Sequence, residues 1–145
     1  MKKVFWVLCM MIFLATSLQA AGFKPYPGAK IDDKATKEAN AMNAKAPGQA
    51  SSTIYTTPDP YEKVAAFYKA LGKEHQMSVK KTKRLPSGQE LKEGYFILDG
   101  AATLSDSKLW VKVQKPYIGK AKMVGLTPKY EDVRDVTAII VVKRK

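Results

Sequence analysis

The 145-residue chain has few of the residues that usually carry catalytic or metal chemistry. Cys9 is its only cysteine and His75 its only histidine. A transition-metal site needs several such ligands, and a histidine base needs a partner. The acidic residues lack the spacing of a calcium loop, and neither a nucleophile elbow nor a phosphate-binding glycine motif occurs. The sequence therefore predicts no catalytic residue, no metal site and no cofactor, and it predicts that His75 is a solvated surface residue.

Long apolar runs are also scarce, since the one clear run lies at the N-terminus. Two lysines precede an apolar segment at residues 4–14, and Ala20 ends a plausible cleavage site. This pattern is typical of a secretory signal peptide, so we expect residues 1–20 to be removed and residues 21–145 to form a single domain. The run is shorter than the roughly 20 residues of a spanning helix, so no transmembrane segment is expected in the mature chain. Leu18 is an unusual residue so close to a cleavage site, which leaves an uncleaved anchor as the alternative.

Acidic residues are the third scarcity. Removal of residues 1–20 takes away Lys2, Lys3 and Cys9. The remaining chain has 23 basic and 13 acidic residues, a net charge of +10, and no cysteine for a disulfide. A positive charge of this size favours an anionic partner, either a component of the envelope or an acidic protein. Nucleic acid is not expected, because export separates the chain from the genome and the basic run has no interleaved aromatic residues. We expect the protein to be periplasmic or secreted.

The clearest element is a helix that begins at Pro60. We predict Asp59 as its N-cap, with Glu62 closing a capping box, and Gly72 in a left-handed conformation at its end. Four large apolar residues recur at helical spacing and share one face, which we expect to organise the core. These are Val64, Phe67, Tyr68 and Leu71.

The remaining pattern predicts an α+β domain, in which two helices pack on one face of an antiparallel sheet of four to five strands. An alanine-rich helix is predicted at about residues 32–45. The apolar face of the strand at 108–115 should meet the helix that begins at Pro60. In residues 116–132 the apolar residues recur with neither helical nor strand spacing. We therefore predict a long loop there and expect it to form a binding surface. The other predicted strands are 53–57, the charged edge strand 77–85, 95–99 and the central strand 133–143.

Several short motifs resemble a recurring pattern of small exported bacterial domains. They are Tyr26-Pro27-Gly28-Ala29, a strand ending at Thr57 before Asp59, and the helix with Val64 and Phe67-Tyr68. Residues 115–119 and 132–140 also resemble members of an uncharacterised periplasmic family. The likeness covers most of the chain after the leader, with 120–130 as extra length. It implies a signal peptide and a helix-on-sheet fold, and it carries no assigned activity.

The leading hypothesis is a non-enzymatic binding or accessory protein of the bacterial envelope that engages an anionic partner through a basic surface. The predicted anion-binding residues are Lys80, Lys81, Lys83, Arg84, Lys120 and Lys122. The alternative for the first four is that their charges protect an edge strand and keep the protein in solution. Two other functions stay open: a small enzyme that uses carboxylates such as Asp99 or Asp106, and a self-assembling envelope subunit.

Overall fold

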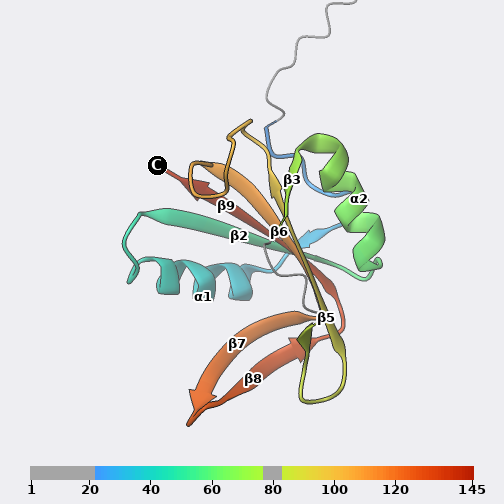
Figure 1. Cartoon of the computed structure of the whole chain (residues 1–145), viewed down its shortest axis with the longest axis vertical. Helices are drawn as coiled ribbons and strands as arrows, with labels where there is room; N and C mark the ends of the chain where they lie inside the picture. The colour runs from blue at the N-terminus through green and yellow to red at the C-terminus, as the bar shows by residue number, and fades with distance from the viewer. Residues whose placement is uncertain (1–21, 77–82) are drawn as a thin grey trace, which may run out of the picture.

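A computed structural model describes residues 22–76 and 83–145; the expected signal peptide, with Lys80 and Lys81, lies outside these ranges. Seven strands of the described part form one antiparallel sheet, with the order β1-β2-β9-β6-β5-β3 and β4 paired to β5, and β7 and β8 form a separate pair (Figure 1). The α+β class is confirmed, with more strands than expected. No helix in the described ranges is long and apolar enough to cross a bilayer.

The elements are β1 (Lys30–Ile31), α1 (Asp33–Asn43), β2 (Ala50–Thr57), α2 (Tyr61–Leu71), β3 (Lys73–His75), β4 (Lys83–Arg84), β5 (Glu90–Ile97), β6 (Leu109–Lys115), β7 (Tyr117–Val124), β8 (Thr127–Arg134) and β9 (Thr137–Arg144).

The two helices lie on opposite faces of the main sheet, so the prediction that both pack on one face is wrong. Strand β9 is central, between β2 and β6, as expected. Its neighbouring residues point to opposite faces. Ile139 packs in a cluster with Val64 and Tyr68 of α2, whereas Ala138 packs with Ala35 of α1. Because β9 is apolar on both sides, each side needs a cover, and one helix supplies each.

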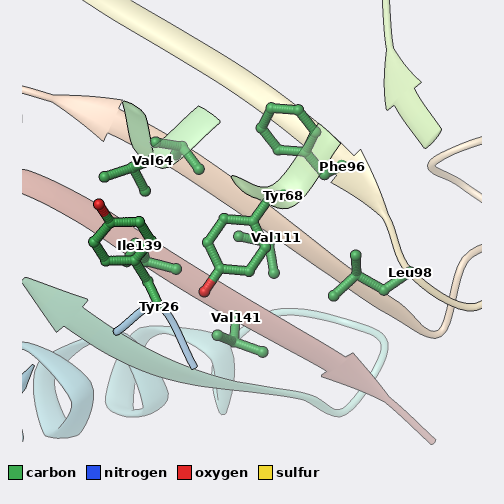
Figure 2. Packing of buried hydrophobic residues seen from close by; sticks show 9 residues of the cluster. Tyr26, Val64, Tyr68, Phe96, Leu98, Val111, Ile139 and Val141 are labelled. Carbon is green, nitrogen blue, oxygen red and sulfur yellow. The ribbon is translucent and has the colours of Figure 1, made fainter. Parts of the chain in front are cut away.

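The larger apolar cluster lies between α2 and the sheet (Figure 2). The predicted contact between the helix face and the apolar face of β6 is confirmed, with Phe67 and Leu71 partly buried at its margin. Tyr68 is fully buried, and its hydroxyl donates a hydrogen bond to the Lys24 carbonyl oxygen at 3.2 Å. Burial raises the pKa of Tyr68 well above its usual value. The buried members are Tyr26, Val64, Tyr68, Phe96, Leu98, Val111, Val113, Ile139 and Val141.

Both ends of α2 differ from the prediction. Asp59 does not cap the helix, because its carboxylate accepts a hydrogen bond from the Tyr26 hydroxyl at 2.5 Å and the N-cap position falls on Pro60. The predicted capping box therefore does not form. Gly72 is extended, with φ −154°, because the chain runs directly into β3. Glycine is needed there for space, since a Cβ would collide with the backbone carbonyl of Ile97.

Helix α1 begins where the sequence predicts and is bonded to β2 through polar side chains. Asp32 accepts a hydrogen bond from a backbone N–H of the first turn at 2.9 Å. The Asn40 amide both donates to the carbonyl oxygen of Ser52 and accepts from its N–H, each at 2.8 Å. The Thr36 hydroxyl accepts from the N–H of Ile54 at 2.9 Å. Since β1 covers only a short part of β2, these bonds satisfy the rest of that sheet edge and hold α1 in place.

The C-terminal half contains more strand than the sequence indicates. Residues 116–132, predicted to be a loop, mostly belong to β7 and β8, and the strand predicted over 133–143 is divided between the end of β8 and β9. Strand β5 begins at Glu90, five residues before the predicted start. Charged residues lie on both faces of β8 but on only one face of β7, and glycine or proline falls within each strand, so alternation of apolar and polar residues is limited to short stretches.

Candidate functional site

The β7–β8 hairpin, residues 117–134, stands apart from the main sheet (Figure 1). Its strands pair antiparallel along their whole length. Gly125 and Leu126 connect them as a two-residue turn, with Gly125 at φ +64°, as a type II′ turn requires of its first central residue. A two-stranded hairpin alone is marginally stable in water, so this one needs an anchor on the body of the protein.

That anchor, which we call the root, consists of Tyr117, Arg134 and Asp32. Tyr117 is buried with Ala35 of α1, and the guanidinium carbon of Arg134 lies 4.5 Å from the centre of its ring. Arg134 Nη2 donates to Asp32 Oδ2 at 2.7 Å, while Asp32 Oδ1 caps α1. The hydrogen bond from the Ala35 N–H, with that from Arg134, outweighs partial burial and holds the pKa of Asp32 below its usual value. One carboxylate thus fixes both the start of α1 and the base of the hairpin.

At the other end, the tip, residues 123–126, exposes three apolar side chains. Met123 is 65% exposed, Val124 is 62% exposed and Leu126 is 98% exposed. Single apolar residues are common on protein surfaces, whereas these three lie close together in sequence at the end of a projecting element. The tip therefore presents a small apolar surface to the solvent.

Three lysines, which we call the collar, lie on the strands just below the tip. They are Lys120, Lys122 and Lys129, and all are exposed. Lys122 and Lys129 are directly opposite each other in the register, where like charges destabilise a strand pair. Lys122 pairs with Glu131 at 3.2 Å, and Lys120 lies 3.9 Å from Glu38. The hairpin thus keeps an excess of positive charge next to its apolar tip.

A cleft of about 720 Å³ lies between β8 and residues 85–89, the turn that links β4 to β5. The turn is closed by hydrogen bonds from the Gly88 N–H to the Leu85 carbonyl oxygen at 2.8 Å and from the Leu85 N–H to the Gln89 carbonyl oxygen at 2.9 Å. The cleft has the size and the mainly apolar lining of small-molecule sites. The apolar lining comes from Leu85, Pro86, Val124, Pro128, Tyr130 and Val133.

Two smaller hollows lie elsewhere on the described surface. One, of about 260 Å³, lies between α1 and β7, with Ile54 and Ile140 among its lining residues. The other, of about 250 Å³, is lined largely by polar and charged residues, among them Glu62 and Lys92, which form an ion pair. Both are smaller than the usual range for ligand sites, so the cleft beside β8 is the stronger candidate.

Of the residues predicted to bind an anion, those that the structure describes lie on different elements. The collar contains Lys120 and Lys122, β4 contains Lys83 and Arg84, and Lys80 and Lys81 lie outside the described residues. Lys83 donates to Glu93 at 2.9 Å, and Lys112 reaches the same carboxylate at 2.7 Å. Burial raises the pKa of Glu93, but the two ammonium groups outweigh it and hold the pKa below its usual value. Lys83 is thus paired, as are Lys120 and Lys122, and the described residues show no ion pair for the third collar lysine, Lys129.

The two carboxylates considered for catalysis both organise the loop between β5 and β6. Asp99 accepts hydrogen bonds from the Lys108 N–H at 2.6 Å and the Ser107 hydroxyl at 2.9 Å. Partial burial raises the pKa of Asp99, but these bonds outweigh it and keep the pKa below its usual value. Asp106 accepts from the Thr103 hydroxyl at 2.6 Å. Neither lines the three hollows above, and no cluster of three metal-ligating side chains occurs in residues 22–76 and 83–145.

The sequence reasoning missed the three apolar residues of the tip. A signal was present, because Gly125 lies between apolar residues in a segment otherwise rich in lysine. Reading this segment as a glycine turn between two short strands would have placed all three at a hairpin end.

Comparison of the chain with protein-family models, with curated proteins and with solved structures finds no match. The resemblance to exported periplasmic domains therefore stays a prediction.

Proposed function

We propose that this chain is a non-enzymatic, exported binding module that docks on an anionic lipid surface of the bacterial envelope through the hairpin tip. The observation that carries the proposal is the tip itself, where Leu126 is 98% exposed beside Met123 and Val124, above a collar of lysines. An acidic glycan would contact the lysines but leave the apolar tip in water. A bilayer interface offers both an apolar layer and anionic groups within a few ångströms.

The dimensions of the hairpin fit such an interface. A strand rises about 3.4 Å per residue, so the Lys122–Lys129 pair lies about 7–10 Å below the turn. Apolar faces of interfacial elements enter about 5–10 Å into the boundary between headgroups and acyl chains. When the tip enters to this depth, the collar lies level with the lipid phosphates.

The energies are also of the right order. Full burial of each tip side chain contributes about 1.5–3 kcal/mol, and each lysine near an anionic membrane contributes about 1 kcal/mol. Neither group alone gives strong binding, but their sum is of the same order as the cost of immobilising the protein, about 4–15 kcal/mol. The net charge of +10 that remains without Lys2 and Lys3 adds long-range attraction to the same surface.

Co-sedimentation with vesicles tests the proposal. We expect binding to phosphatidylglycerol vesicles at low salt, weaker binding at high salt and little binding to phosphatidylcholine vesicles. Leu126→Ser should lower the affinity for anionic vesicles about tenfold, because it removes the most exposed apolar group. The double variant Lys122→Gln and Lys129→Gln should also lower it, and should reduce its salt dependence.

Matched controls separate the tip from general surface properties. Ile31→Ser changes an apolar residue on β1 that is 52% exposed, and Lys143→Gln with Lys145→Gln removes two charges at the C-terminus, which lies far from the hairpin in Figure 1. Both controls should bind nearly as the wild type does. Unchanged vesicle binding by Leu126→Ser would reject the proposal. Tight binding to heparin or polyglutamate without vesicle binding would instead indicate a glycan or an acidic protein.

A further inference from the structure

The cleft beside β8 differs from the tip in chemistry and needs its own explanation. Its two walls are mainly apolar, and Lys129 is the one charged residue among the described residues that line it. On the opposite wall Ser87 Oγ accepts from the Gln89 N–H at 3.4 Å, which leaves its hydroxyl hydrogen available. The cleft therefore combines a long apolar surface with one cation and a hydroxyl donor.

The walls are already formed. Leu85 is only 5% exposed and lies in a turn closed by backbone hydrogen bonds, and Val133 is 41% exposed on a paired strand. A site that needs little ordering loses less affinity on binding. Val124 belongs to both the cleft and the tip, so the two apolar surfaces are continuous.

We propose that this cleft binds one long-chain fatty acid, whose carboxylate pairs with Lys129 and whose chain lies against Leu85, Pro86 and Val133. A single negative charge matches the single cation of the lining, and a linear alkyl chain matches a cleft bounded by a strand and a turn. A phosphate monoester carries more charge than this lining neutralises. This site shares Val124 and Lys129 with the membrane contact proposed above, but Leu126 does not line it, so the two proposals can be tested apart.

Calorimetric titration of the full chain with dodecanoate, below its micelle-forming concentration, tests the site. We expect saturable binding of one molecule per chain, and weaker binding of the uncharged dodecanol. Val133→Asp places a charge on the apolar wall at a partly exposed position and should lower the affinity at least tenfold. Lys129→Gln should lower dodecanoate affinity about three- to tenfold and leave dodecanol affinity unchanged.

Two further variants distinguish this proposal from the membrane proposal. Ile31→Asp, the matched control on β1, should bind dodecanoate as the wild type does. Leu126→Ser should also keep dodecanoate binding, even though it weakens vesicle binding. Circular dichroism verifies the fold of each variant, and a spin-labelled fatty acid should broaden amide signals of residues 85 and 133 but not those of α2. Equal binding of Val133→Asp and wild type, equal affinity for dodecanol and dodecanoate, or tighter binding of lysophosphatidylglycerol would overturn the assignment to a fatty acid.

Discussion

The core beneath α2 and the tip of the β7–β8 hairpin use similar apolar residues in opposite ways. Tyr68 is fully buried among aromatic and aliphatic side chains, whereas Leu126 is 98% exposed. The first arrangement gains free energy on folding, and the second leaves apolar surface in water, as the proposed membrane contact requires. Stability and binding should therefore respond to different substitutions.

The root connects the hairpin to the body of the protein. The Asp32 carboxylate accepts hydrogen bonds from Arg134 of the hairpin and from the first turn of α1, so it stabilises both parts. Substitutions ranked by their expected effect on unfolding should run from core to root to tip.

Tyr68→Ala should have the largest effect. Loss of a buried aromatic ring destabilises a protein by about 3–5 kcal/mol, because the cavity left behind does not close completely. Denaturant unfolding monitored by circular dichroism measures the change. The protein that remains folded should bind anionic vesicles as the wild type does, and a loss below about 1 kcal/mol would contradict the assigned core.

Gly72→Ala should come next. The new Cβ would meet the Ile97 carbonyl oxygen, and such overpacking costs about 1–3 kcal/mol. Gly22→Ala is the matched control, since a Cβ there meets no atom within 4 Å. Thermal unfolding of the two variants compares them. Equal unfolding temperatures would mean that space is not what requires glycine at the end of α2.

Asp32→Ala should have an intermediate effect, since loss of an N-cap costs about 1–2 kcal/mol. The root should loosen as well, so amide hydrogen exchange should increase along β7 and β8. Asp33→Ala, which changes the next, exposed acidic residue, should show neither effect.

The same carboxylate predicts a pH dependence. The pKa of Asp32 is lowered in the folded protein, so its contribution is complete above the usual carboxyl pKa of about 4. The contribution is lost as the pH falls through the folded value. Below pH 4 the stabilities of wild type and Asp32→Ala should converge, whereas a constant difference down to pH 2 would contradict this role.

Leu126→Ser should have the smallest effect on unfolding, within about 0.5 kcal/mol, because the side chain loses almost no contact. Its effect on vesicle binding should be the largest of the four substitutions. Denaturant unfolding and co-sedimentation on one preparation give both values. A clear loss of stability would mean that the tip packs on the body.

The parts of the fold that depend on short-range pattern were predictable. The spacing of Val64, Tyr68 and Leu71 identified α2 and its buried face, and the alternation around Val111 identified β6. The start of α1 was predicted near residue 32 from the change of pattern there, and the structure shows that Asp32 caps it. The hairpin was missed because its glycine and proline residues leave only short stretches of alternating apolar and polar residues in β7 and β8.

The sequence by itself determined the composition and the local structure of this protein. It has almost no cysteine or histidine, a large positive charge, one strongly amphipathic helix and one strand with alternating apolar residues. Only the tertiary structure decided which sheet face each helix covers and that Leu126 is left in water. It also decided that Asp59 accepts a hydrogen bond from Tyr26 and does not cap α2. The physical reason is that these outcomes depend on residues far apart in the chain. Asp59 and Tyr26 are separated by 33 positions, and Asp32 and Arg134 by 102, so no local pattern specifies either contact.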